Sequence, residues 1–237
     1  MAQPRVVAFD AFETSFSMTP LRKILRRAGL RRSQTELWVS NSLRDAFAVQ
    51  ACAMFHPFLD VMLGAMSALM EQHGLHVTPE LRAELAFALE RLRPQRDFRR
   101  ALKLLSAAHI PAVIVTNGSS LATESSLENA GLDDAVAHVF SVEDVRNFKP
   151  AHPAYLQIPE AMHVAPMEVL LLSAHAWDIH GAVAAGLRAA YVERGQHFSP
   201  MFEPPEYFAS SLDEAVMTAL RDDALLSIET LPPPLVV

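Results

Sequence analysis

The residues of this chain that can do chemistry follow the ends of its apolar runs. Asp10 ends the first run, Val-Val-Ala-Phe, and Thr116, Asn117 and Asp178 follow later runs, with Lys149 between them. In an open α/β sheet the ligand crevice lies outside the carboxyl ends of the strands. We therefore expect a carboxylate, a hydroxyl and amide pair, an ammonium and a second carboxylate to share one pocket.

Asp10, held at the end of a buried strand, is suited to act as a nucleophile. A carboxylate can attack an electrophilic carbon or phosphorus, and water then hydrolyses the resulting ester or acyl phosphate. A nearby cation favours the ionised form, and Lys149, followed by Pro150, is the candidate. The alternative is that Asp10 only caps the next helix.

Thr116 and Asn117 offer a hydroxyl and an amide that can hold an anionic or leaving group. Gly118, which follows them, permits close approach of the backbone. The alternative is a turn, because Asn-Gly is a common turn pair.

Asp178 can position a water molecule, orient Lys149 or bind a metal, or it can simply open a helix, where negative charge is favoured. Trp177 either lines an apolar pocket or belongs to the core. His175 and His180 lie five residues apart, which is poor helical spacing for a shared ligand, so we predict no zinc site.

The elements that must position these residues alternate in type. Continuous apolar runs typical of buried parallel strands cover residues 5–9, 112–115, 137–140, 169–172 and 189–192. Helical segments separate the later runs, which implies right-handed crossovers. From Thr19-Pro20 onward a helical pattern continues for about seventy residues with no strand signal.

We therefore predict an α/β fold, a doubly wound parallel sheet with an inserted all-helical cap. The predicted core comprises residues 1–16 and 93–222, and the cap comprises residues 17–92. A last helix is expected over residues 212–220, and residues 223–237 are expected to form a flexible tail.

Composition excludes several classes of function. The chain has 237 residues, 51% of them hydrophobic, and a formal net charge of −7, which argues against non-specific binding of nucleic acid. No apolar stretch approaches the ~20 residues that span a bilayer, so we predict no membrane insertion. Cys52 is the single cysteine, and no signal-peptide pattern precedes the first strand, which together favour a cytoplasmic location.

The chain resembles the haloacid dehalogenase (HAD) superfamily in four ordered motifs: Asp10-Ala-Phe-Glu-Thr14, Thr116-Asn117-Gly118, Phe148-Lys149-Pro150 and Ala174-His-Ala-Trp-Asp178. The Ala-Trp-Asp ending and the early helical insertion resemble its L-2-haloacid dehalogenase (type II) branch. The resemblance reaches to about Val192. It implies a HAD-like Rossmannoid core and a hydrolase without a cofactor, acting on a small 2-substituted carboxylic acid.

The resemblance also implies residue roles. Asp10 would attack the substrate carbon, displace halide and form an ester. The catalytic residues implied with it are Thr14, Lys149 and Asp178. The substrate-binding residues implied are Phe12, Thr116, Asn117, Tyr155, Ser173, His175 and Trp177, of which Phe12 and Trp177 would form an apolar wall.

Phe12 is the departure that bears on the reaction type. Phosphatases of the superfamily need a second Asp at this position, so its replacement disfavours a Mg²⁺-dependent phosphatase. Asp10 and Asp178 are the only evident carboxylates of the pocket, and a hard cation wants more oxygen ligands. We therefore predict metal-independent activity.

Val39 is the departure that bears on the substrate. In the branch an Arg follows a Leu-Trp pair of the cap and binds halide and the substrate carboxylate, whereas here Trp38 is followed by Val39, and Arg44 is not at the matching place. Glu13 replaces a usual Gly and His175 replaces a usual Asn. The hypothesis is that the reaction type is retained while the preferred substrate has changed.

Three alternatives stay open at this point: a related hydrolase that opens a strained C–N bond, a Mg²⁺-dependent phosphatase, and a catalytically silent binding protein. A homodimer is a further hypothesis, because members of the branch often pair through cap helices. The cap carries an apolar stripe that is either partner surface or intramolecular core, formed by Phe55, Phe58, Met62, Met66 and Met70.

Overall fold

A six-stranded parallel sheet organises the molecule, seen in a computed structural model that describes residues 3–229. Its strand order is β5-β4-β1-β6-β7-β8. The strands are β1 (Val6–Asp10), β4 (Ala112–Thr116), β5 (His138–Ser141), β6 (Val169–Ser173), β7 (Arg188–Val192) and β8 (Tyr207–Ala209). The predicted α/β fold with a doubly wound parallel sheet is therefore confirmed.

β1 is an inner strand because all five of its residues are buried and it has a parallel neighbour on each side. Asp10 pairs in register with Val115 of β4, and Phe9 pairs with Leu172 of β6. The three strands consequently end side by side, each delivering its next residues to the same edge of the sheet.

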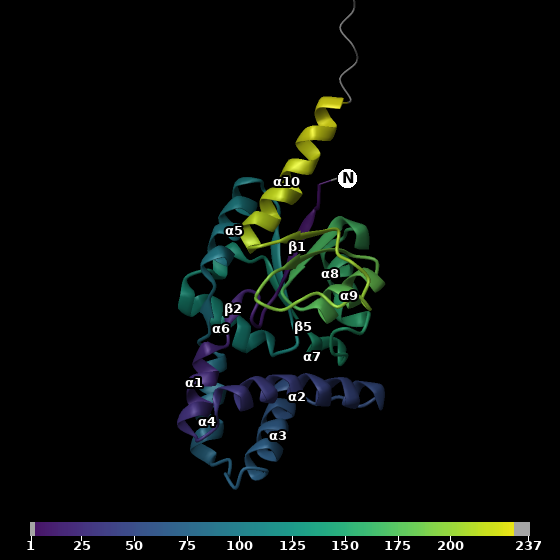
Figure 1. Cartoon of the computed structure of the whole chain (residues 1–237). Helices are drawn as coiled ribbons and strands as arrows, with labels where there is room; N and C mark the ends of the chain where they lie inside the picture. The colour runs from purple at the N-terminus through teal and green to yellow at the C-terminus, as the bar shows by residue number, and fades with distance from the viewer. Residues whose placement is uncertain (1–2, 230–237) are drawn as a thin grey trace, which may run out of the picture.

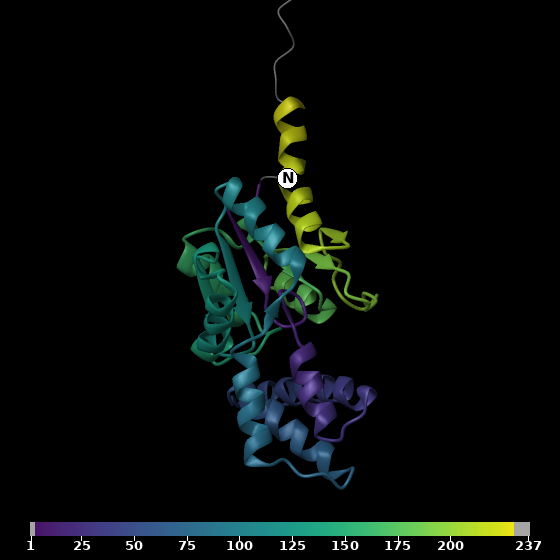
Figure 2. The same cartoon turned by 90° about the vertical axis from the view of Figure 1, so that its left-hand side faces the viewer.

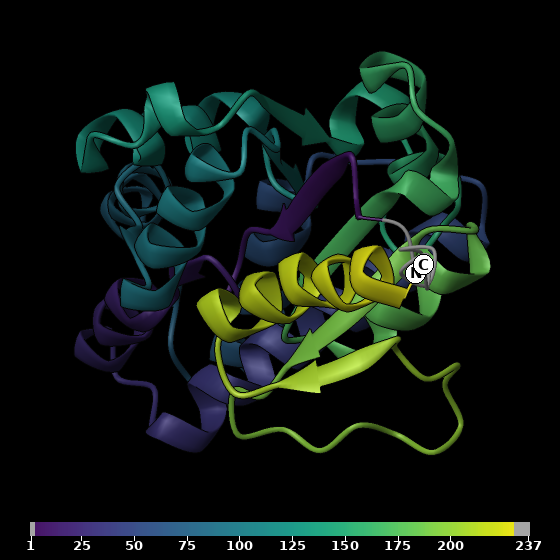
Figure 3. The ribbon, with the colours of Figure 1, turned by 90° about the horizontal axis from the view of Figure 1, so that it is seen from above.

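Helices cover both faces of the sheet. Seen from above, α5 and α6 lie on one side of the strands and α8 and α9 on the other (Figure 3). The last helix, α10, packs along α5 (Figure 1). The helices of this part are α5 (Arg96–Ala107), α6 (Ser120–Ala130), α7 (Val142–Val145), α8 (Pro153–Met162), α9 (Ala176–Ala184) and α10 (Leu212–Glu229), with 3₁₀ turns at Asp133–Ala135 and Pro166–Glu168.

Four helices form a separate layer beyond the carboxyl ends of the strands (Figures 1 and 2). The chain enters and leaves this layer through an antiparallel pair, β2 (Phe16–Ser17) and β3 (Arg93–Pro94). The four helices are α1 (Thr19–Arg27), α2 (Arg32–Ala51), α3 (Phe58–Glu71) and α4 (Pro79–Leu89). We refer to them together as the cap.

Two features at the carboxyl end of the chain differ from the sequence expectations. β8 was not predicted, because its apolar run of three residues is too short to indicate a strand without the pairing with β7. α10 continues to Glu229 instead of ending at Leu220, since no Gly or Pro interrupts it. The expected tail, 223–237, thus overlaps this helix, and residues 230–237 lie outside the described part.

The apolar stripe of the cap is intramolecular core. Phe58, Met62, Met66 and Met70 are buried within the single chain, and Phe55 is half-buried against it. The stripe therefore gives no support to the homodimer hypothesis.

Among residues 3–229, no helix combines the length and the apolar character that crossing a membrane requires.

Candidate active site

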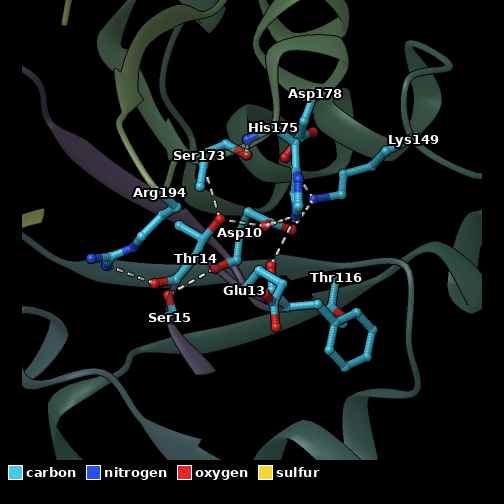
Figure 4. A network of polar contacts seen from close by, with 12 residues as sticks. Asp10, Glu13, Thr14, Ser15, Thr116, Lys149, Ser173, His175, Asp178 and Arg194 are labelled. Atoms are coloured by element: carbon cyan, nitrogen blue, oxygen red, sulfur yellow. Dashed lines mark hydrogen bonds and ion pairs between the residues drawn. The ribbon is translucent and has the colours of Figure 1, made fainter. Parts of the chain in front are cut away.

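Asp10 is buried at the tip of β1, and each of its carboxylate oxygens accepts a short hydrogen bond. Thr14 Oγ1 donates to Oδ2 at 2.6 Å, and Lys149 Nζ donates to Oδ1 at 2.6 Å (Figure 4). The Ser15 hydroxyl donates to the Asp10 carbonyl at 2.7 Å, which closes the turn after the strand. The carboxylate therefore does not cap a helix, and the pairing of Asp10 with Lys149 agrees with the expectation.

Lys149 is a fully buried cation that lies between two carboxylates. Its Nζ donates to Asp10 at 2.6 Å, to Asp178 Oδ2 at 2.9 Å and to the Val115 carbonyl at 3.2 Å. Burial on its own lowers the pKa of Lys149, but the charges of Asp10 and Asp178 outweigh it and hold the pKa above 10.5. The ammonium therefore stays protonated at neutral pH.

Asp178 lies in the first turn of α9 and is fully buried behind Lys149. Its Oδ1 accepts a hydrogen bond from the Tyr155 hydroxyl at 2.7 Å. Burial, and then the charge of Asp178, raise the pKa of Tyr155 well above 10.0, so its hydroxyl keeps the proton that it donates. Both oxygens of Asp178 are thus engaged, which fixes Lys149 toward Asp10.

Thr116 and Asn117 extend the site from β4. The Thr116 hydroxyl accepts the Gly118 N–H at 2.9 Å, and the side-chain Oδ1 of Asn117 accepts the backbone N–H of Lys149 at 2.9 Å. The second bond orients the Asn117 NH₂ group as the donor available to a bound molecule. The Asn-Gly pair therefore makes a turn and also positions the loop that carries Lys149.

His175 and Trp177 come from the turn that joins β6 to α9. His175 Nε2 lies 3.0 Å from the Phe12 carbonyl and 3.6 Å from Asp10 Oδ2. The imidazole stacks on Trp177 with ring centroids 5.4 Å apart. Ser173, in contrast, is fully buried and accepts the His175 N–H through its hydroxyl at 3.1 Å.

A small cavity of about 40 Å³ lies above Asp10, between the strand ends and the cap. Its lining includes Asp10, Phe12, Asn117, His175 and Trp177 from the core. The cap contributes Val39, Ser42 and Leu43 from α2 and Phe58 and Met62 from α3. We call this space the Asp10 cavity.

A family model of the haloacid dehalogenase-like hydrolases matches residues 4–186 of the chain. The chain belongs to this family. The four motifs from which the resemblance was inferred all lie within the matched residues.

Relatives of the family carry the same branch assignment. The (S)-2-haloacid dehalogenase of Xanthobacter autotrophicus is 30% identical over 192 residues, which cover 80% of this chain and 75% of the relative. The (S)-2-haloacid dehalogenase 2 of Pseudomonas sp. (strain CBS-3) is 26% identical over 218 residues, 90% of this chain and 95% of the relative. The chain therefore stands in the L-2-haloacid dehalogenase branch.

A solved structure has the same fold. The L-2-haloacid dehalogenase of Xanthobacter autotrophicus with chloropropionic acid covalently bound matches with a TM-score of 0.83 and 24% sequence identity. The match covers 92% of this chain and 98% of the other.

Within this family framework, the predicted site residues divide into two groups. Asp10, Phe12, Asn117, His175 and Trp177 line the Asp10 cavity. Thr14, Thr116, Lys149, Tyr155, Ser173 and Asp178 do not line it and lie behind its wall. Direct substrate binding by Thr116, Tyr155 and Ser173 thus stays a prediction, and their contacts favour a positioning role.

Glu13 also lines the Asp10 cavity and forms an ion pair with Arg22 that the motifs did not predict. Arg22 Nη1 lies 3.0 Å from both carboxylate oxygens of Glu13, and Oε1 also accepts the Met18 N–H at 2.9 Å. Glu13 has a left-handed φ of 61°, a conformation in which Gly carries no steric cost. The side chain of Glu13 therefore ties the nucleophile loop to α1; the usual Gly at this position signals the left-handed backbone but not this contact.

Arg194 is a further residue that sequence reasoning missed. Its Nη2 donates to the Thr14 carbonyl at 3.1 Å and to Asp97 Oδ2 at 2.7 Å. The same Asp97 oxygen accepts the Leu212 N–H at 3.0 Å, so one buried carboxylate joins α5, α10 and the nucleophile loop. No motif signals this pairing, because its partners lie more than ninety residues apart in the sequence.

Val39 lines the Asp10 cavity where the branch resemblance leads one to expect a guanidinium. Arg44 pairs with its neighbour Asp45, and together with Arg22 it lines a wider hollow of about 480 Å³ outside Val39. Neither arginine lines the Asp10 cavity itself.

The donor set around Asp10 does not fit a hard divalent cation. Among the described residues, no cluster of three or more His, Cys, Asp or Glu side chains has a geometry that could hold a metal ion. The Lys149 ammonium also occupies the space between the carboxylates of Asp10 and Asp178.

Proposed function

We propose that this protein is a metal-independent hydrolase that releases halide from small 2-haloacids through a covalent ester on Asp10. The observation that carries the proposal is the buried Asp10 carboxylate, held by hydrogen bonds from Lys149 and Thr14 at the base of an apolar cavity. The names of the relatives support the substrate class. The chloropropionic acid bound covalently in the Xanthobacter enzyme supports the ester.

The first step is a displacement at C2 of the substrate. A carboxylate oxygen of Asp10 forms a bond to C2 while the carbon–halogen bond breaks and the halide leaves with its electron pair. Asp10 is buried, so its carboxylate attacks without a full hydration shell. Lys149 and Thr14 hold Asp10 in position, and the Asn117 NH₂ group can donate to the departing halide or the substrate carboxylate.

The second step is hydrolysis of the ester. Water attacks Cγ of Asp10, and the bond from Cγ to the ester oxygen, which came from Asp10, breaks. That oxygen leaves as the hydroxyl group of the 2-hydroxyacid with one proton of the water, and the other proton is released to solvent as the Asp10 carboxylate is restored with the oxygen of the water. Lys149 and Thr14 stabilise the negative charge that develops on the carboxyl oxygens. His175 lines the cavity beside the ester, with Nε2 3.0 Å from the Phe12 carbonyl and 3.6 Å from Asp10 Oδ2, and it helps to hold the loop that carries Asp10.

Trapping the ester tests the proposal. Incubation with 2-chloropropionate followed by rapid acid quench should add the mass of one propionate unit to the peptide that contains Asp10, with halide released in equal amount. Asp10→Asn should give neither, whereas Asp134→Asn, an exposed carboxylate change, should behave as the wild type. Halide release by Asp10→Asn at the wild-type rate, or full activity with no adduct, would contradict the mechanism.

Assays with other substrates separate the alternatives. A strained cyclic 2-amino acid tests C–N bond opening, and an aryl phosphate with Mg²⁺ tests phosphatase activity. Halide release should be unchanged by EDTA. Silence with every substrate would favour a binding protein.

Location and assembly complete the proposal. An exposed, unpaired Cys52 supports a cytoplasmic protein. The homodimer hypothesis is now supported only by the branch resemblance, because the apolar stripe of the cap is buried within one chain. Sedimentation velocity decides between monomer and homodimer.

A further inference from the structure

A second cavity of about 150 Å³ lies next to the Asp10 cavity, between the cap and the core. Its walls come from α3 and α4 of the cap and from α6 of the core, and they include Leu59, Ala86, Leu89 and Ala122. We call it the side chamber. It has room for roughly five groups the size of a water molecule, whereas the Asp10 cavity is about 40 Å³.

Three side chains separate the two spaces, because Phe12, Phe58 and Met62 line both of them. The rings of Phe12 and Phe58 are stacked with centroids 6.0 Å apart. Phe12 also packs on Gly118 so closely that a Cβ there would lie 2.8 Å from its ring. The two rings are therefore a fixed part of the wall.

Met62 is the part of the wall that can move. Its backbone is held because its carbonyl accepts the Trp38 Nε1–H at 2.8 Å. Its side chain is unbranched and has several rotamers of similar energy, so a change of rotamer is cheap. A change of the Met62 rotamer would join the two cavities without moving either ring.

The chemistry of the side chamber selects an apolar occupant. Its hydroxyl groups bond to nearby backbone: Ser126 donates to the Leu89 carbonyl at 3.1 Å and accepts the Leu92 N–H at 3.1 Å, and Thr123 donates to the Ser119 carbonyl at 3.0 Å. Among the described residues that line the chamber there is no Lys, Arg or His, and the carboxylate of Glu90, which also lines it, lies 3.5 Å from the Arg91 guanidinium. A polar or anionic ligand would therefore lose hydration without gaining partners.

We propose that the side chamber binds the alkyl chain of the substrate, so that the preferred substrates are 2-substituted carboxylic acids with chains of several carbons. This inference rests on the proposed function, because C2 must lie over Asp10 while the chain passes Met62. Each buried methylene should raise kcat/KM about fourfold, from the transfer free energy of about 0.8 kcal/mol per CH₂.

A series of 2-bromoalkanoates of increasing chain length tests the proposal with one pair of matched variants. Ala86→Phe fills the chamber from α4, whereas Ala83→Phe adds the same ring on the exposed side of the same helix. The wild type and Ala83→Phe should both show kcat/KM rising with chain length as far as the chamber reaches. Ala86→Phe should leave kcat/KM for bromoacetate and 2-bromopropionate within about twofold of the wild-type value. It should lower kcat/KM for the longer acids at least tenfold.

Binding of unreactive 2-hydroxyalkanoates, measured by calorimetry, gives a readout that does not need turnover. Chain-dependent affinity that Ala86→Phe abolishes, with no halide released from any acid, would uphold the chamber and reject the dehalogenase function. A flat dependence on chain length in both assays would overturn the chamber proposal. The proposal would also be overturned if a correctly folded Ala86→Phe variant lost the same factor of affinity for short and for long acids.

Discussion

At the scale of single residues, Lys149 explains how two carboxylates can be buried at one point. Asp10 and Asp178 are each less than a tenth exposed, and burial of a charged group is costly unless an opposite charge contacts it. The ammonium satisfies both, and the Tyr155 hydroxyl satisfies the remaining oxygen of Asp178. Breaking such a buried pair by removal of one partner typically costs about 3–5 kcal/mol.

The raised pKa values of Lys149 and Tyr155 predict a loss of stability at alkaline pH. Both groups keep their protons in the folded chain above pH 10.5 and 10.0, where the unfolded chain releases them. The unfolded state then binds fewer protons than the folded state, so the free energy of unfolding falls as pH rises. Below pH 10 these two groups do not make the free energy of unfolding depend on pH. Urea titrations from pH 9 to pH 11.5 should show this fall.

Tyr155→Phe should make that slope shallower by about 1.4 kcal/mol per pH unit. Lys103→Met, which removes an exposed lysine of α5, should leave the slope unchanged. Equal slopes in Tyr155→Phe and the wild type would show that Tyr155 titrates normally in the folded protein.

Val39→Arg should increase activity on short 2-haloacids by about tenfold or more, because a guanidinium on the lining of the Asp10 cavity can stabilise the departing halide. Halide release from 2-chloropropionate measures the gain. Leu37→Arg adds the same charge to the exposed side of α2 and should have no such effect. A decrease in Val39→Arg would mean that this pocket requires an apolar residue at that position.

At the scale of elements, the site depends on how closely α9 approaches the loop of Lys149. Gly181 of α9 allows this approach, since a Cβ there would lie 2.5 Å from Pro150 Cβ and 2.6 Å from the Tyr155 hydroxyl. Asp178 lies one helical turn before Gly181, so the spacing of the helix also sets the distance from Asp178 to Lys149.

Gly181→Ala should therefore impair the site, while Gly64→Ala should not. The first change should cost about 1–3 kcal/mol of stability through overpacking and lower kcat by displacing Asp178. Gly64 lies inside α3 with no atom within 4 Å of the added methyl, so its substitution should stabilise by about 0.5–1 kcal/mol. Thermal unfolding and halide release measure both, and a Gly181→Ala variant with wild-type kcat would contradict this account of α9.

At the scale of the whole molecule, the Asp10 cavity exists only where the cap meets the core. Gln50 of α2 makes a polar link across this boundary. Its Oε1 accepts the Phe148 N–H at 2.9 Å, and its Nε2 donates to Asn147 Oδ1 at 3.0 Å. The cap is thus tied to the residue that precedes Lys149.

Gln50→Ala should destabilise the protein by about 1 kcal/mol and lower kcat/KM several-fold, because it leaves the Phe148 N–H without its partner and loosens the cap. Gln72→Ala, an exposed change at the end of α3, is the control and should be neutral. The measurements are urea unfolding and steady-state halide release. Loss of stability with unchanged kcat/KM would show that the link is only structural.

The sequence by itself determined the sheet, the helical insertion and the central residues of the site. Buried parallel strands are continuous apolar runs, and the residues that end them must meet at one edge, so Asp10, Thr116 and Asp178 could be brought together from local pattern alone. The cation that buried carboxylates need pointed to Lys149, and the family resemblance then added Thr14 and Tyr155.

Only the tertiary structure decided which of these side chains face the cavity and what surrounds them. Several contacts join residues in a way that no local sequence pattern predicts. They are the pairing of the left-handed Glu13 with Arg22, the link from Arg194 to Asp97, and the wall formed by Phe12, Phe58 and Met62. The physical reason is that periodicity reports which face of one element is buried, whereas the shape of a pocket depends on how separate elements pack against one another.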